Sequence, residues 1–140
     1  MPHARTDPAR MFSLRGRTAF VTGASRGIGQ ALAIGLAAAG ADLVIGARTA
    51  PGLDETAAAI GDTGRACLSL PLDVTSAASR AAALEQMRQN GVRPDILVNN
   101  AGMEEVRPAT DIDEALWDRI LDTNLKGAFF VARDFARSLM

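Results

Sequence analysis

The sequence predicts an α/β fold built on a doubly wound parallel sheet. Short runs of strand-forming residues alternate along the chain with stretches in which apolar residues recur at helical intervals, and this alternation is typical of βαβ units. The 140 residues are enough for one domain, or part of one, with a real core. Because 48% of the residues are hydrophobic but only 4% are aromatic, that core is expected to consist mainly of Ala, Leu, Ile and Val.

Four short runs rich in apolar residues predict the strands. The first ends at a glycine, and the others are likewise bounded by polar residues, glycine or proline, as buried strands usually are. In chain order the predicted strands are Thr18–Thr22, Asp42–Ala47, Ala66–Leu70 and Asp95–Val98.

Helices are predicted between these strands and after the last one. Apolar and small residues recur at helical intervals from Ile28, and Gly40 closes that helix. A short Ala-rich helix is expected over Leu53–Ile60, and another runs to about Asn90 with Ser76 as its N-cap. A single stripe marks a long final helix: Trp117, Ile120, Leu121, Asn124, Leu125, Ala128, Val131, Ala132 and Phe135.

Composition excludes several classes of protein. The net charge of −1 gives no basic field for nucleic acid, and the single cysteine, Cys67, cannot form an intramolecular disulfide. The start of the chain lacks the apolar stretch of a secretory signal, and no apolar run approaches the roughly 20 residues that span a bilayer. We therefore expect a cytoplasmic protein with no membrane partner. Residues 1–13 are expected to be a disordered tail that includes His3, which leaves no metal-binding histidine in the domain over residues 14–140.

The most informative segment is the glycine-rich turn between the first strand and the first helix. It reads Thr22-Gly-Ala-Ser-Arg-Gly-Ile-Gly29. Glycines in this position can simply form a tight turn, but they also let the backbone approach a pyrophosphate that rests on the N–H groups of the helix. The strand before the turn and the helix after it favour the phosphate-binding interpretation.

Four motifs, in order along the chain, resemble the short-chain dehydrogenase/reductase family. The turn has the spacing T-G-x-x-x-G-x-G, and Leu14–Arg17 resembles the family's usual opening before the first strand. Leu72–Val74 follows the third strand, Asn99–Gly102 follows the fourth, and Asp122–Leu125 carries the asparagine of the final helix. The resemblance covers nearly the whole chain and implies a Rossmann-type sheet in the order 3-2-1-4, with the family's later strands absent.

The resemblance also assigns roles to residues. Those implied to contact the phosphates and the adenosine ribose are Gly23, Ser25, Arg26, Gly27 and Ile28. Those implied to flank the adenine are Asp73 and Val74, and those implied to lie along the cofactor near its riboses are Asn99, Ala101 and Gly102. For Asn100 we favour a structural role that ties loops together across the sheet.

The end of the second strand bears on the choice of dinucleotide. NAD-binding folds usually place an acid there to bind the ribose 2′-OH, but this chain has Ala47 followed by Arg48. Neither Asp42, at the start of the strand, nor Asp54, in the next helix, fits that position. Guanidinium groups suit a 2′-phosphate, so Arg48 together with Arg26 favours NADP over NAD, although Arg48 at a strand end is also compatible with an ordinary solvated residue.

Asn124 falls on the apolar stripe of the final helix, so its amide is expected to point into an apolar interface. A buried amide without partners costs roughly 1–3 kcal/mol, and something must therefore hydrogen-bond to it. One interpretation is an asparagine that braces a neighbouring strand. The resemblance implies a catalytic role instead, in which Asn124 holds a water in a proton relay.

The residues that carry the family's chemistry are missing from this sequence. The family uses a serine after the fifth strand and a Tyr-x-x-x-Lys pair on the following helix, and this chain has no tyrosine. Lys126 and Ser138 lie on the helix before that point and cannot replace them. Two hypotheses remain. The first is an inactive cofactor-binding fragment of an NADP-dependent oxidoreductase acting on a carbonyl/alcohol pair, a homodimer or homotetramer through the final helix when complete. The second is a short, non-catalytic dinucleotide-binding protein.

Overall fold

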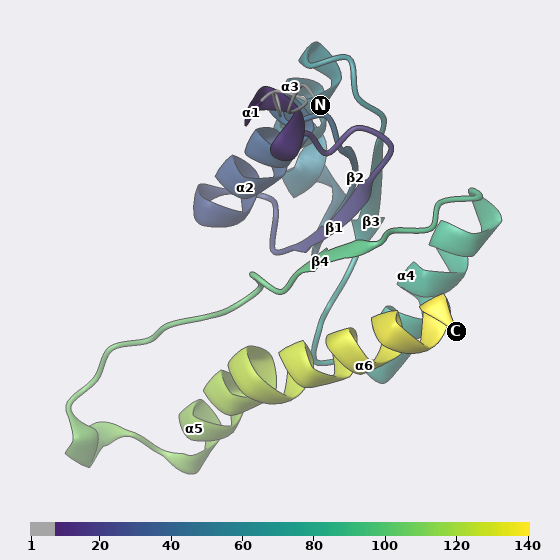
Figure 1. Cartoon of the computed structure of the whole chain (residues 1–140). Coiled ribbons are helices and arrows are strands. Elements are labelled where there is room, and N and C mark those ends of the chain that lie inside the picture. Colours follow the sequence, from purple (N-terminus) through teal and green to yellow (C-terminus); the bar gives the residue numbers. More distant parts are fainter. Residues whose placement is uncertain (1–7) are drawn as a thin grey trace, which may run out of the picture.

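Four parallel strands form the central sheet of the computed structural model, which describes residues 8–140 (Figure 1). The strands are β1 (Thr18–Thr22), β2 (Asp42–Ala47), β3 (Cys67–Pro71) and β4 (Ile96–Val98). Their order across the sheet is β3-β2-β1-β4, which confirms the predicted order 3-2-1-4. The chain therefore reverses its direction of travel across the sheet beside β1, whose two neighbours are β2 and β4.

Helices cover both faces of this sheet. Figure 1 shows α2 and α3 on one face and α4 and α6 on the other. The helical elements between β1 and β4 in the chain are α2 (Gly27–Ala38), the 3-10 turn η1 (Ala50–Leu53), α3 (Asp54–Asp62) and α4 (Ala77–Gln89). Those after β4 are the 3-10 turn η2 (Ala109–Asp111), α5 (Glu114–Leu121), the π-helical segment η3 (Asp122–Gly127) and α6 (Ala128–Leu139).

The core is divided into two layers by the alternation of side chains along the strands. Ala19 and Val21 of β1 face the layer that contains residues of α2 and α3, whereas Phe20 between them faces the layer of α4 and α6. Val44 of β2 joins Phe20 in the second layer. Burial on both faces explains why the strands consist of almost continuous apolar residues.

Two helix ends match the sequence prediction closely. Ser76 caps α4, because its side-chain oxygen accepts a hydrogen bond from the backbone N–H of Ser79 at 3.2 Å. Gly40 follows α2 with a φ of +107°, a conformation that glycine adopts without steric cost. Both ends are set by local chemistry, so a single sequence is sufficient to locate them.

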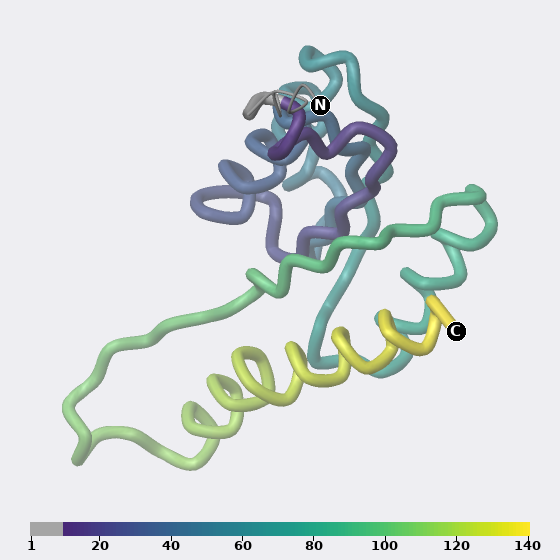
Figure 2. Tube along the Cα trace, viewed as in Figure 1, coloured from purple at the N-terminus to yellow at the C-terminus, as the bar shows by residue number. Residues whose placement is uncertain are grey.

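The final helix differs from its prediction. It is interrupted by η3, and the long connection from β4 carries α5 away from the sheet before α6 returns to pack beside α4 (Figures 1 and 2). Val131 and Phe135 of α6 are buried, but Trp117 and Leu125 are 58% and 66% exposed. The expectation of one continuous buried stripe is therefore wrong for α5 and η3 and correct for α6.

The first part of the chain is described only from residue 8. Residues 1–7 of the predicted disordered tail, including His3, lie outside the described residues. Pro8–Met11 forms the short helix α1. In the described part of the chain, no helix combines the length and the hydropathy needed to cross a bilayer.

Candidate functional site

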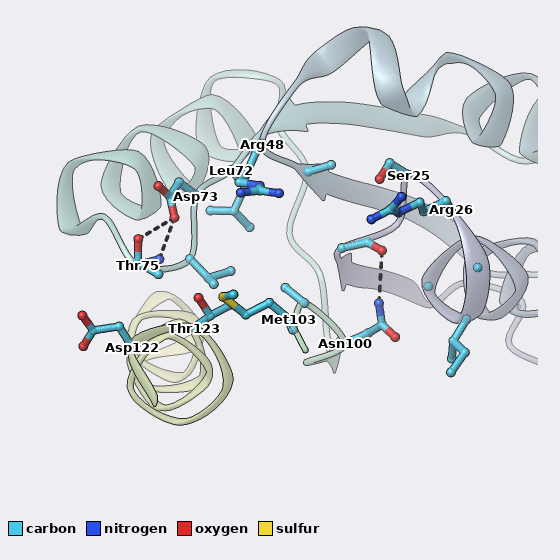
Figure 3. A pocket seen from close by; sticks show the side chains of 18 of the residues that line it. Ser25, Arg26, Arg48, Leu72, Asp73, Thr75, Asn100, Met103, Asp122 and Thr123 are labelled. Carbon is cyan, nitrogen blue, oxygen red and sulfur yellow. Dashed lines mark hydrogen bonds between the residues drawn. The ribbon is translucent and has the colours of Figure 1, made fainter. Parts of the chain in front are cut away.

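A pocket of about 660 Å³ lies at the carboxyl ends of the strands (Figure 3). The loops that follow all four strands contribute to its lining, and α5 and η3 add Arg119, Asp122 and Thr123. The pocket thus lies beside β1, where the order of the strands reverses. This is the position at which open parallel sheets bind their ligands.

Two glycines of the β1–α2 turn have different functions. Both adopt left-handed backbone conformations, with φ of +68° at Gly23 and +58° at Gly27. A Cβ at Gly23 would lie 2.8 Å from the Cα of Ala101, so this glycine allows the turn to pack against the loop after β4. A Cβ at Gly27 would meet no protein atom within 4 Å, and Gly27 lines the pocket. The space beside Gly27 is therefore available to a ligand.

The N-terminus of α2 opens onto this space. The helix begins at Gly27, and the N-cap residue Arg26 makes no side-chain capping hydrogen bond. Gly27, Ile28 and Gly29 all line the pocket. A helix N-terminus carries partial positive charge and presents backbone N–H groups, so this wall of the pocket is suited to an anion such as a phosphate.

Thr22 and Asn100 hold the two loops on either side of the pocket floor together. The Asn100 Nδ2 donates to the carbonyl oxygens of Thr22 and Gly23 at 3.0 and 3.1 Å, and the second of these bonds is visible in Figure 3. The backbone N–H groups of Asn100 and Ala101 both donate to the Thr22 Oγ1, at 3.1 and 3.0 Å. This network confirms the loop-tying role predicted for Asn100.

Asp73 forms part of the opposite wall. Its Oδ1 accepts hydrogen bonds from the backbone N–H and the hydroxyl of Thr75, at 2.9 and 2.7 Å (Figure 3). The hydroxyl bond is the main reason that the pKa of Asp73 is lowered, and the positive charge of Arg48 adds to this effect. The Asp73 carboxylate is therefore ionised and locally fixed at neutral pH.

Two arginines from different loops supply positive charge to the pocket. Arg26 precedes α2, Arg48 follows β2, and both are exposed residues in the lining. Figure 3 shows their guanidinium groups directed toward the same space. Within residues 8–140, neither arginine forms a salt bridge with a protein carboxylate. Ala47 occupies the last position of β2, so that strand end carries no acid.

Most of the residues that the sequence analysis singled out meet at this pocket. The lining includes Gly23, Ser25, Arg26, Gly27, Ile28, Arg48, Asp73, Val74, Ala101 and Gly102. Asn99 lies outside the lining, and its Nδ2 donates to the carbonyl oxygen of Ala128 at 3.0 Å.

Asn124 also lies outside the lining and is exposed, so the expectation that it is buried is wrong. The reason is the displacement of α5 and η3 from the sheet. Its amide nevertheless has partners: Oδ1 accepts from the backbone N–H of Met103 and Nδ2 donates to the Met103 carbonyl, both at 2.8 Å. Asn124 therefore attaches η3 to the loop after β4.

Several lining residues were absent from the sequence-based site. Gly29 closes the glycine motif but was assigned no role, and Thr75 and Met103 directly follow predicted residues. Widening those two motifs by one position would have included Thr75 and Met103. Arg119 and Thr123 reach the pocket only through the path of the chain after β4, which the sequence pattern does not specify. No group of three or more His, Cys, Asp or Glu residues suited to a metal ion occurs within residues 8–140.

Comparisons with known proteins identify the family of the chain. The family model for short chain dehydrogenases matches residues 17–140. The chain is 36% identical over 129 residues to 2-dehydro-3-deoxy-D-gluconate 5-dehydrogenase of Dickeya dadantii. The match covers 92% of this chain and 50% of that protein. The chain spans about half the length of the curated relatives it matches.

Solved structures of dehydrogenases are also similar to this chain. A structure assigned as a short-chain alcohol dehydrogenase from Sinorhizobium meliloti is 52% identical, with a TM-score of 0.87, over 91% of this chain and 51% of that one. Gluconate 5-dehydrogenase of Burkholderia cenocepacia, in complex with NADP and tartrate, is 37% identical with a TM-score of 0.86, over 94% and 51% of the two chains. The fold, the glycine turn at the strand ends and these matches together place the chain in the short-chain dehydrogenase family.

Proposed function

We propose that this chain forms the NADP-binding part of a short-chain dehydrogenase that transfers hydride between the nicotinamide and a carbonyl/alcohol substrate. The observation that carries the proposal is the corner of the pocket formed by Ala47, Arg48 and Arg26. A 2′-phosphate requires positive charge and tolerates no acid at the end of β2, and both conditions are met. The similar gluconate 5-dehydrogenase that carries bound NADP supports this choice.

The pocket fits a dinucleotide in its other parts as well. The open space beside Gly27 and the N-terminus of α2 suit the pyrophosphate. The Asp73–Thr75 wall suits the adenine side, and Ala101 and Gly102 extend the lining away from it. When bound, the cofactor would supply the hydride, while these residues would hold and orient it. For Asn99, which lies outside the lining, we propose a structural role through its bond to Ala128.

The substrate class is proposed from the relatives. Matches to sugar-acid dehydrogenases lead us to propose a hydroxy acid or keto acid of the sugar series as the substrate of the whole protein. The chain contains no tyrosine, the family's proton donor, so we propose that the 140 residues bind cofactor without turning over substrate. The same absence supports a second candidate, a non-catalytic dinucleotide-binding protein. The two candidates differ in one expected result. Only the first predicts dehydrogenase activity when the chain is part of a protein as long as its relatives.

Asn124 is proposed to brace the pocket rather than to relay protons. Both atoms of its amide are paired with the backbone of Met103, which itself lines the pocket. We also propose a cytoplasmic protein that forms a homodimer or homotetramer through the final helix. The exposed Trp117, Leu125 and Phe129 support the choice of that helix, and sedimentation velocity tests it.

The cofactor proposal is tested by calorimetric titration of the chain with NADP⁺ and NAD⁺. We expect Arg48→Ala to weaken NADP⁺ binding by roughly 10- to 150-fold, since a hydrogen bond to a charged group contributes about 1.5–3 kcal/mol, and to leave NAD⁺ binding nearly unchanged. Arg137→Ala, an exposed arginine of α6 outside the pocket, is the matched control. Equal losses for both cofactors in Arg48→Ala would show that Arg48 does not select NADP⁺.

A further inference from the structure

Arg80 of α4 is the only charged residue that is buried within the described part of the chain, with 7% of its surface exposed. Arginine is rarely buried unless its charge is paired. The Arg80 Nε donates to the Asp134 carboxylate of α6 at 3.1 Å, and its guanidinium lies 5.1 Å from the centre of the Phe130 ring. Asp134 is held in turn by the guanidinium of Arg133, at 2.6 and 2.9 Å.

The remaining contact of Arg80 leads to the pocket. One terminal nitrogen donates to the carbonyl oxygen of Val74 at 2.8 Å in a buried hydrogen bond. Val74 lies between Asp73 and Thr75, and all three residues line the pocket. Arg80 is thus joined to the main chain of the pocket wall, although it does not line the pocket itself.

The main chain at Val74 is enclosed from a second side. A Cβ at Gly127 of η3 would lie 2.9 Å from the Val74 side chain and 3.1 Å from the Val74 carbonyl oxygen, so the backbone of η3 packs directly against this residue. On the α4 side, the Ser79 hydroxyl accepts a hydrogen bond from the Asp73 N–H at 2.9 Å. The turn after β3 is therefore held between α4 and η3, with Arg80 bonded at its centre.

Stability alone does not account for this arrangement. Apolar residues of similar volume often replace a buried ion pair without loss of stability. A guanidinium, however, has donors in a fixed planar fork, so it can bind the Val74 carbonyl and the Asp134 carboxylate at the same time and fix their relative positions. We infer that Arg80 is a positioning residue: anchored by Asp134, it fixes the Val74 main chain and so aligns the Asp73–Thr75 wall with the adenine side of the cofactor. This inference rests on the proposed function.

The test compares three variants of the full chain. Arg80→Met removes the guanidinium but keeps most of the apolar stem, and Arg80→Lys keeps the charge without the fork. Arg88→Met makes the same change on α4 at an exposed arginine whose guanidinium pairs with Glu85 on the helix surface, away from the pocket. The readouts are amide hydrogen exchange and calorimetric affinity for NADP⁺ and for adenosine 2′,5′-bisphosphate, which carries the adenine side alone.

We expect Arg80→Met to speed exchange at the amides of residues 73–76 and to weaken both ligands about tenfold, with exchange over Gly23–Gly29 unchanged. Arg80→Lys should recover part of the affinity, and Arg88→Met should match the unaltered chain. An Arg80→Met protein that is less stable overall but keeps the affinity and the exchange of Arg88→Met would overturn the inference. If the unaltered chain binds neither ligand, the proposed function fails, and exchange at residues 73–76 still decides the role of Arg80. Should Arg80→Met fail to fold, Asp134→Asn is expected to show the same changes to a smaller degree, and their absence would contradict the inference.

Discussion

Replacing Thr22 by valine removes one hydroxyl from the centre of the site while keeping the shape of the side chain. Thr22 is fully buried, and its Oγ1 accepts hydrogen bonds from the N–H groups of Asn100 and Ala101. In the variant both N–H groups lose this partner, and a buried donor left unsatisfied costs about 1–3 kcal/mol. Because Asn100 and Ala101 are only half-buried, we take the lower part of that range for each and expect a loss of about 2–4 kcal/mol in the free energy of unfolding.

The assay is equilibrium unfolding in urea, followed by circular dichroism. Thr18→Val provides the matched control, since Thr18 begins the same strand and its hydroxyl forms no hydrogen bond within residues 8–140. The control should change the unfolding free energy by less than about 0.5 kcal/mol. If Thr22→Val unfolds at the same urea concentration as Thr18→Val, the hydroxyl does not hold the two loops together and the account of the pocket floor is incorrect.

Two further predictions concern single residues of the pocket. Gly27→Ala should lower the free energy of unfolding by about 1–2 kcal/mol, because alanine is strained in the left-handed conformation of this residue, and it should also weaken NADP⁺ binding. Gly64 has a φ of +76° and equally open space but lies outside the pocket, so Gly64→Ala should show only the loss of stability. Equal NADP⁺ affinities in the two variants would refute the phosphate-binding role of Gly27. Asp73→Asn should lower stability near neutral pH, and urea unfolding at several pH values measures the difference. Since the folded pKa of Asp73 is depressed, its stabilisation is present above the unfolded pKa and disappears as the pH falls through the folded pKa, so a pH-independent difference would contradict the reasoning.

The strands and the motif residues were predictable because their causes are local. β1 and β2 have the predicted bounds, since a strand buried on both faces is made of almost continuous apolar residues. The loops that follow parallel strands converge at one edge of the sheet, so the order of the motifs was enough to bring most of the predicted residues into one pocket. The cap at Ser76 followed from hydrogen-bonding chemistry within a single turn.

The chain after β4 was less predictable, because its course depends on distant contacts. An interval of 3.6 residues predicts a continuous α-helix, but η3 is π-helical and shifts the phase of the side chains between α5 and α6. Leu116 is consequently buried while the neighbouring Trp117 is exposed. The partner of Asn124 is the backbone of Met103, 21 residues earlier, and a backbone partner leaves no signal in the sequence.

Backbone amide mapping with NADP⁺ tests the central claim most directly, namely that the pocket at the strand ends binds this dinucleotide. The measurement is hydrogen exchange of the chain with and without saturating NADP⁺. The account predicts slower exchange in three of the loops that line the pocket: Gly23–Gly29, Asp73–Thr75 and Ala101–Met103. Exchange that is unchanged at saturation, or slowed only outside these loops, would contradict it.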